Sequence, residues 1–286
     1  MSDWSDSAGK MANLPWAHLR LPPFPQVATR VLQLVNRENV QLNQLSELIS
    51  TDPAFASEVL TVANSPLYAL RYHASSILQA VAILGGNALQ GMCITVGVRA
   101  YLGKGMNQPA MRAFWRHNLA CAVVAQLIAT GSEFDKDTAY TAGILHDIGR
   151  AALALVMPKE YSQLLSQHKG NNRSLLEGER NLFGVDHCEA GLQLIQDWKL
   201  PAEFEAVVAA HHEPIKPGTT WNLSELVKVS CAIADAAGYP SFAGCEAAAY
   251  DELRAKVPEF ARTQLSEDRA ELAEKIFDSI RHIESV

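Results

Sequence analysis

Side chains of the types that bind metal ions are spread along the chain between residues 117 and 235. They are His117, His146, Asp147, His187, His211, His212 and Asp235. Neutral imidazoles and carboxylates together suit borderline divalent metals such as iron, manganese or zinc, and a bridging carboxylate can hold two ions side by side. Two such ions can activate a water molecule for attack on phosphorus. The sequence therefore predicts a site for one or two divalent metal ions.

The centre of this set is the pair His146-Asp147, inside Thr141-Ala-Gly-Ile-Leu-His-Asp-Ile-Gly-Arg150. The local pattern predicts one helix from Thr138 to Met157, which Pro158 ends. Neighbours on a helix point about 100° apart, so both side chains can reach one ion that lies between their directions. Gly149 costs about 1 kcal/mol relative to alanine in a helix interior, which indicates close approach of another backbone.

The other histidines lie in or beside predicted helices. His117 falls in the middle of one. His187 falls in the first turn after a predicted Asp186 cap, where the positive helix end favours a neutral ring. His211 and His212 fall in a last turn, where the carbonyl end favours a cation. Each has an ordinary alternative: a hydrogen-bonded core residue for His117, a surface residue for His187 and helix-end capping for the pair.

Asp235 is the acidic member farthest along the chain, within the apolar stretch Cys231-Ala-Ile-Ala-Asp-Ala-Ala237. Aspartate is seldom buried without a partner, so it needs a cation, a hydrogen-bonding neighbour or solvent. A bare helical scaffold without metal is therefore harder to reconcile with this sequence. Taken jointly, the side chains are expected to meet at one point between helices.

The elements that must position these residues are predicted to be helices. Apolar residues recur at helical spacing along most of the chain, and no alternating strand pattern is found. The main boundaries are an Asp52-Pro53 start, a Gly85-Gly86 break, a helix over 110–130, and capping boxes at Ser174–Glu177 and Asp186–Glu189. The expected fold class is all-α, a multi-helix bundle of two packed helical subdomains.

The expected division of the chain follows from its breaks. Residues 1–13 are predicted to be a disordered tail, 14–107 an N-terminal helical subdomain, and 108–286 a second helical subdomain. The junction is the Gly, Lys, Asn and Pro cluster at 103–109. The N-terminal subdomain contains no comparable cluster of candidate catalytic or metal-binding side chains, so it is interpreted as a regulatory or partner-facing layer.

Composition narrows the function classes. The net charge of −7 comes without any long basic block, which argues against a duplex nucleic-acid binder. The five cysteines include no C-x-x-C pair and are typical of free thiols in a reducing cytosol. The N-terminus has no signal-peptide pattern, and no apolar run approaches the roughly 18 residues that span a bilayer. We therefore expect a cytoplasmic protein without a membrane partner; its oligomeric state is not predicted.

Several short motifs resemble one family. The order of the candidate ligands is similar to that of HD-domain phosphohydrolases, particularly the HD-GYP branch that hydrolyses cyclic dinucleotides. The surrounding motifs resemble an HDOD domain, the HD-related output domain, more closely. These motifs are Leu21-Pro-Pro-Phe-Pro25, Thr51-Asp-Pro53, Ala63-Asn-Ser-Pro-Leu-Tyr68, Ala82-Ile-Leu-Gly85, Trp115-Arg-His-Asn118, Gly143-Ile-Leu-His-Asp-Ile-Gly149, Trp198-Lys-Leu-Pro201 and His211-His-Glu-Pro214.

The resemblance implies one HDOD unit over residues 14–240, with an HD-domain-like C-terminal part, found in bacterial signal transduction and often without demonstrated catalysis. Two departures separate the chain from the catalytic branch. After His211-His212-Glu213 the HD-GYP pattern Asp-Gly-x-Gly-Tyr-Pro is replaced by Pro214-Ile-Lys-Pro-Gly-Thr-Thr220. Arg150 stands where the phosphohydrolase branch favours lysine, and a planar fork does not replace a point charge.

Two functional hypotheses follow. The first is a signalling output module with an HD-type metal site, binding a signalling protein or a small phosphorylated or nucleotide effector. The second is a metal-dependent phosphohydrolase acting on a phosphomonoester or a nucleotide second messenger. In that case Asp147 and Arg150 would be its catalytic residues, with Arg150 offsetting phosphate charge.

Overall fold

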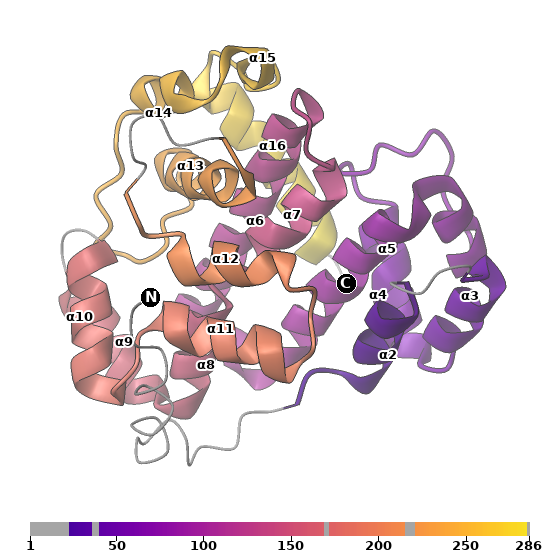
Figure 1. Cartoon of the computed structure of the whole chain (residues 1–286), viewed down its shortest axis with the longest axis horizontal. Coiled ribbons are helices and arrows are strands. Elements are labelled where there is room, and N and C mark those ends of the chain that lie inside the picture. The colour runs from indigo at the N-terminus through magenta and orange to yellow at the C-terminus, as the bar shows by residue number, and fades with distance from the viewer. Residues whose placement is uncertain (1–22, 36–39, 169–171, 215–220, 285–286) are drawn as a thin grey trace, which may run out of the picture.

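The computed structural model describes residues 23–35, 40–168, 172–214 and 221–284, and this part is built from helices without a β-strand (Figure 1). The all-α prediction is confirmed. The predicted tail at 1–13 lies outside the described residues. The division at 107/108 stays a prediction.

The N-terminal helices form a layer around one long helix. They are α2 (Gln26–Val35), α3 (Leu42–Ser50) and α4 (Pro53–Ala63), which pack on α5 (Ile77–Leu102). The predicted start of α4 is confirmed, because the Asp52 side chain accepts hydrogen bonds from the Ala54 and Phe55 amides, both at 3.1 Å. Val31, Leu45 and Val59 face the common core.

The long helix α5 is kinked at Gly85, whose φ of 84° is a conformation that glycine adopts without strain. The predicted break is therefore present. Beyond it, α5 also packs on α7: a Cβ at Gly91 would lie 2.9 Å from Thr141 Oγ1, and the Thr95 and Tyr140 hydroxyls lie 3.1 Å apart. α5 thus contacts both the outer layer and the second half of the molecule.

By length and composition alone, α5 is long and apolar enough to cross a membrane. The sequence prediction that no apolar stretch approaches the length of a membrane span did not recognise this helix. However, 67% of its most apolar window is buried inside the fold. Apolar residues all round a buried helix are expected of a core helix.

The second half of the molecule is assembled around three central helices, α6 (Pro109–Thr130), α7 (Lys136–Leu145) and α13 (Leu223–Ala236), with α11 (His187–Asp197) packed on α8 (Ile148–Val156) beside them (Figure 1). The remaining elements are η2 (Gly103–Asn107), α9 (Pro158–Gln167), α10 (Asn172–Phe183), α12 (Glu203–Ala210), α14 (Tyr250–Lys256), α15 (Glu259–Arg262) and α16 (Arg269–Glu284).

The predicted single helix over Thr138–Met157 is wrong, because the chain breaks at His146-Asp147. α7 ends at Leu145, α8 begins at Ile148, and Asp147 has φ −108° and ψ 13°. α7 packs against α6, whereas α8 packs against α11. A Cβ at Gly143 would lie 2.5 Å from Ala122 Cα on α6. The break lets α8 turn toward α11 while α7 stays against α6.

Gly149 explains why α8 can dock so closely on α11. A Cβ at this position would lie 1.8 Å from the carbonyl oxygen of His187 and 2.6 Å from the amide nitrogen of Gly191. No other residue type fits between these backbones. The sequence prediction of a close backbone approach at Gly149 is confirmed.

The two predicted capping boxes have different outcomes. Asp186 and Glu189 form theirs: the Glu189 amide donates to the Asp186 carboxylate at 2.9 Å and the Asp186 amide to the Glu189 carboxylate at 3.0 Å. The box at Ser174–Glu177 is wrong, since α10 already begins at Asn172 and Ser174 lies inside its first turn. The Ser174 hydroxyl lies 3.1 Å from His168 Nε2 instead.

Candidate metal centre

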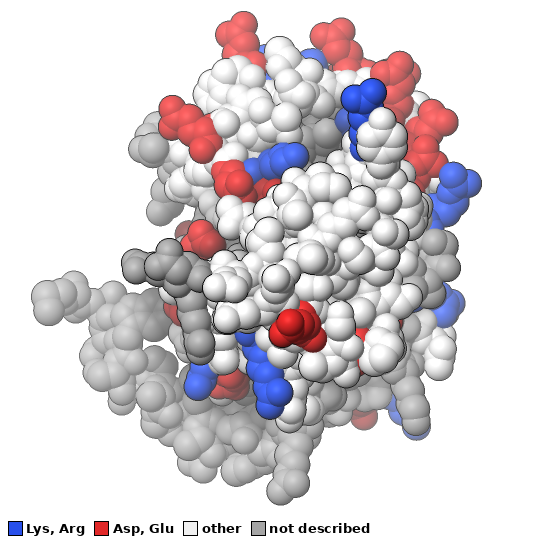
Figure 2. All heavy atoms as spheres, turned by 90° about the vertical axis from the view of Figure 1, so that its right-hand side faces the viewer, with Lys and Arg blue, Asp and Glu red and all other residues white. Residues whose placement is uncertain are grey.

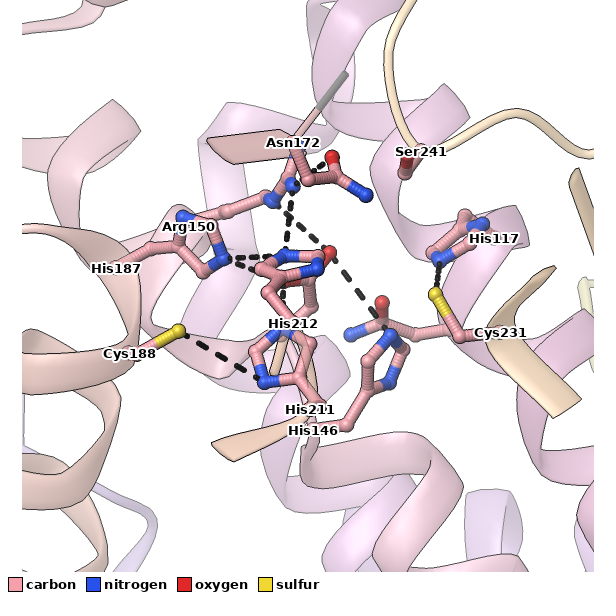
Figure 3. A network of polar contacts seen from close by, with 12 residues as sticks. His117, His146, Arg150, Asn172, His187, Cys188, His211, His212, Cys231 and Ser241 are labelled. Carbon is pink, nitrogen blue, oxygen red and sulfur yellow. Dashed lines mark hydrogen bonds and ion pairs between the residues drawn. The ribbon is translucent and has the colours of Figure 1, made fainter. Parts of the chain in front are cut away.

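The break between α7 and α8 places His146 and Asp147 at the centre of the second half, where both are fully buried. Figure 3 shows His146 beside the imidazoles of His117 and His211. His146 follows Leu145, the last residue of α7, and Asp147 precedes Ile148, the first residue of α8. His146 Nε2 and Asp147 Oδ2 lie 3.9 Å apart. Two groups of metal-binding atoms meet on either side of this pair.

The first group consists of Asp147, His187, His211 and His212, whose ligand atoms all lie within 4.8 Å of one another. Asp147 Oδ1 is 3.0 Å from His211 Nε2 and 3.2 Å from His187 Nε2. The Nε2 atoms of His187 and His212 lie 2.9 Å apart. This is a three-nitrogen, one-oxygen donor set contributed by three different segments.

Local structure fixes the orientation of two of these imidazoles. The capping box holds His187 in the first turn of α11. His211 follows the last residue of α12, and its Nδ1 lies 2.9 Å from the carbonyl oxygen of Val208. A carbonyl can only accept, so His211 Nδ1 carries the proton and Nε2 is left for a ligand.

A buried carboxylate behind His187 was not predicted. Glu179 on α10 accepts from His187 Nδ1 at 2.6 Å and from the His187 amide at 2.9 Å, and from the Tyr161 hydroxyl at 2.7 Å. A carboxylate on the far nitrogen of a ligand histidine is the usual outer-shell partner of a metal site. The spacing Leu175, Glu179, Phe183 could have indicated that Glu179 lies on the buried face of α10.

The pKa values of two histidines in this group are shifted in opposite directions. Burial alone would lower the pKa of His187, but the Glu179 carboxylate raises it to about 9. Burial lowers the pKa of His212 well below its usual value. The short contact between their Nε2 atoms is therefore a hydrogen bond from a protonated His187 to a neutral His212. A divalent ion would take the place of that proton.

The second group consists of His117 on α6, His146, and Cys231 on α13, whose ligand atoms also lie within 4.8 Å of one another. All three residues are buried. His117 Nε2 lies 3.5 Å from Cys231 Sγ. The sequence predicted Cys231 only as one of five free thiols, and burial raises the pKa of this thiol well above the usual value. The available signal was its position one helical turn before Asp235.

Asp235 lies beside this group and in neither of the two. Its Oδ1 is 3.4 Å from His117 Nδ1 and accepts a hydrogen bond of 2.7 Å from the Ser241 amide. Its Oδ2 accepts from the Cys245 thiol at 3.5 Å. The structure therefore brings Asp235 to the far nitrogen of His117, and its role as a ligand stays a prediction.

Arg150 closes the centre on the side of Asp147. Its guanidinium is buried, with Nε 2.9 Å from Asp147 Oδ2 and Nη2 3.1 Å from Asn172 Oδ1 and 3.3 Å from His212 Nε2. Burial would raise the pKa of Asp147, but Arg150 and the neighbouring histidines hold it well below its usual value. Asp147 is thus an ionised carboxylate at the junction of the two groups.

The residues present fit a divalent metal ion. His146 Nε2 is buried without a hydrogen-bond partner, and such an orphaned acceptor is costly unless a cation meets it. Imidazoles, a carboxylate and a thiol are ligands of borderline metals. Asp147, His187, His211 and His212 could hold one ion, and the group around His146 another.

A small cavity of about 170 Å³ borders the centre. Arg150, Tyr161 and Phe242 line it together with apolar residues of α6, α8 and α9. A cavity of about 150 Å³ holds a molecule the size of benzene. The pocket is partly open to solvent, so a ligand can extend beyond this volume.

Comparison with known proteins gives the family. The HDOD domain model matches residues 21–214. An uncharacterized protein of Treponema pallidum (strain Nichols) is 24% identical over 198 residues, which are 68% of this chain and 38% of that relative. The chain thus spans well under two thirds of the length of this relative.

Solved structures share the fold. An HDOD domain protein of unknown function from Geobacter sulfurreducens has a TM-score of 0.68 and 26% identity, with 98% of this chain and 95% of that chain covered. A candidate metal-dependent phosphohydrolase of Shewanella amazonensis SB2B has a TM-score of 0.67 and 22% identity, with 97% and 96% covered. Since the family match extends over well more than half of its 286 residues, this chain belongs to the HDOD family.

Proposed function

We propose that this protein is an output module of bacterial signal transduction, in which an HD-type metal centre supports a helical surface that binds a partner protein. The observation that carries the proposal is the buried ion pair between Arg150 and Asp147. Asp147 is the carboxylate best placed to bridge two ions. However, its Oδ2 is already paired with the guanidinium of Arg150, which stays charged, so this oxygen is not free to bind a second ion.

The surroundings of the centre support binding over turnover. His146, Asp147 and His187 are fully buried. The neighbouring pocket is lined mainly by apolar side chains, and Arg150 is the one charged residue among its lining residues. A pocket with so little charge is a poor match for the phosphates of a nucleotide, so a protein partner is favoured over a phosphorylated or nucleotide effector.

The N-terminal layer offers a surface for such a partner. Residues 40–102 contain only five charged residues: Glu47, Asp52, Glu58, Arg71 and Arg99. The same segment exposes large apolar side chains at Leu42, Tyr72, Leu78 and Ile83. Figure 2 looks onto the side that carries α3 and α5 and shows a broad area with few charged groups. Exposed apolar area with little charge is typical of protein interaction sites.

The experiment pairs metal analysis of protein purified without an affinity tag with hydrolysis assays on a chromogenic phosphodiester and on cyclic dinucleotides. We expect bound divalent metal and no turnover. Replacement of His146 and Asp147 by alanine should remove the metal. Turnover that this double variant abolishes would overturn the module and establish the enzyme, and a wild-type protein without metal would refute the metal centre.

The second candidate is a metal-dependent phosphohydrolase. It is favoured by the adjacency of the two donor groups, which meet at His146 and Asp147, and by the description of the Shewanella amazonensis neighbour. In this case the ions would activate water and Arg150 would balance charge on the phosphate. The assays above distinguish the two candidates.

A further inference from the structure

The side chains around His146 include Cys231, which the ligand set expected from the sequence leaves out, whereas Asp235, one of the expected ligands, lies beside them. Three observations concern this difference: the tautomer of His117, the tautomer of His146, and the directions of Cys231 and Asp235 on α13. Figure 3 shows the contact between His117 and Cys231, with His146 close to both.

The tautomer of His117 is fixed by the backbone. Its Nδ1 lies 2.8 Å from the carbonyl oxygen of Tyr239, which can only accept, so Nδ1 carries the proton. The lone pair therefore lies on Nε2. That atom is 3.5 Å from Cys231 Sγ.

The tautomer of His146 is also fixed by a backbone carbonyl. Its Nδ1 lies 2.7 Å from the carbonyl oxygen of Gly143 and carries the proton. Its Nε2 is buried and makes no hydrogen bond. Two imidazole lone pairs and a sulfur atom thus lie within 4.8 Å of one another, on three different segments of the chain.

The helix α13 presents the thiol and not the carboxylate to this point. Both oxygens of Asp235 are engaged elsewhere, Oδ1 by the Ser241 amide at 2.7 Å and Oδ2 by the Cys245 thiol at 3.5 Å. Asp235 approaches His117 at Nδ1, the nitrogen opposite to the cluster. A carboxylate there orients the ring and raises its basicity.

We propose that His117, His146 and Cys231 bind a thiophilic divalent ion such as zinc, with Cys231 as a thiolate ligand and Asp235 as the residue that positions His117. Two imidazoles and one thiolate are a donor set that zinc accepts in tetrahedral sites, with a fourth position left open. The neighbouring group of Asp147, His187, His211 and His212 has no sulfur. The inference rests on the metal centre of the proposed function.

The experiment loads metal-free full-length protein with cobalt(II) and follows the near-ultraviolet thiolate-to-cobalt charge-transfer band, with metal content measured in parallel. We expect the band in wild type, its loss in Cys231→Ser, and its retention in Cys93→Ala, which removes a buried thiol of α5 outside the cluster. Asp235→Asn should keep the band and weaken metal binding about 10–100-fold.

X-ray absorption of the zinc-loaded wild type needs no variant and should detect a sulfur atom at about 2.3 Å from zinc. Cobalt binding without the band, or loss of the ion in Asp235→Asn but not in Cys231→Ser, would overturn the inference and leave the proposed metal centre standing. A wild-type protein that binds neither ion would overturn both.

Discussion

Among single residues, Glu179 has the largest influence on the donor group of Asp147, His187, His211 and His212, because it orients His187. Glu179 fixes the imidazole through Nδ1 and the backbone through the His187 amide. The Tyr161 hydroxyl holds Glu179 in turn. These contacts lead to two predictions.

Glu179→Gln should weaken metal binding about 10–100-fold, because the ligand ring loses its charged partner. Titration calorimetry with zinc or manganese measures the change. Glu177→Gln is the matched control, since Glu177 lies on the same helix but is exposed. Equal affinities in the two variants would contradict a positioning role for Glu179.

Metal-free protein should lose stability as the pH rises from about 6.5 to about 9. The pKa of His187 is raised to about 9 in the fold, against about 6.5 for an unperturbed histidine. Its protonation therefore stabilises the fold fully below about pH 6.5 and no longer above about pH 9. Urea unfolding across this range measures the effect, and Glu179→Gln should flatten the profile. A wild-type profile as flat as that of the variant would refute the assignment.

Much of the site was predictable from residue types together with helical spacing, because His146, Asp147, His187, His211 and His212 lie in segments with clear helical signals. The structure brings these five together. Glu179 and Cys231 were missed for a physical reason. The role of each depends on a histidine of another helix, His187 for Glu179 and His117 for Cys231. The sequence contains the spacing within a helix but not the contact between helices.

At the scale of elements, the break between α7 and α8 is the main difference from expectation. Residues 138–157 contain no proline, and their local preference is helical throughout. The break arises from tertiary packing, since Gly143 lies against α6 and Gly149 against α11. Tertiary contacts commonly override local propensity.

Gly149→Ala should separate α8 from α11 and displace His187. The new Cβ would lie 1.8 Å from a backbone carbonyl oxygen, which no side-chain rotation can relieve. We expect a loss of at least about 1–3 kcal/mol in the free energy of unfolding, with weaker metal binding. Denaturant unfolding and metal titration measure both effects.

Gly86→Ala is the control for this experiment. Its nearest contact would be Val35 Cγ1 at 3.4 Å, a flexible side chain. The change should be neutral or stabilise by up to about 1 kcal/mol, because alanine favours a helix over glycine. Equal destabilisation by the two substitutions would contradict the importance of the contact between α8 and α11.

At the scale of the whole molecule, the helical class and most helix boundaries followed from periodicity, prolines and caps. The burial of α5 did not, because an apolar helix of this length looks the same in sequence whether neighbours or lipid surround it. Only the packing of α2, α3, α4 and α7 around α5 decides the question.

Bound metal should raise the stability of the whole fold. An ion that binds only the folded state stabilises it by about 2.7 kcal/mol when its free concentration is 100 times Kd. Addition of a chelator should therefore lower the thermal midpoint of wild type and leave that of the variant with alanine at His146 and Asp147 unchanged. The same shift in both proteins would place the stabilising ion elsewhere.

Ile83→Asp should disrupt partner binding without affecting the metal centre. Ile83 is 55% exposed on the weakly charged N-terminal layer, so the substitution should change stability by no more than about 0.5 kcal/mol. Phe277→Asp on α16 is matched, with 54% exposure. In a bacterial signalling assay, only Ile83→Asp should reduce the output, with metal content equal in both. Equal output from the two variants would argue against this surface.

The kinked helix α5 connects these two regions, because it packs against the N-terminal helices α2, α3 and α4 and also against α7, whose last residue directly precedes His146. A partner that shifts α5 when it docks would therefore be expected to displace α7 and the imidazole of His146, and an ion bound at His146 would in turn favour one position of α5. Thermodynamic linkage makes such influence mutual: if an ion tightens the grip on a partner by some factor, the partner retains the ion more tightly by that same factor.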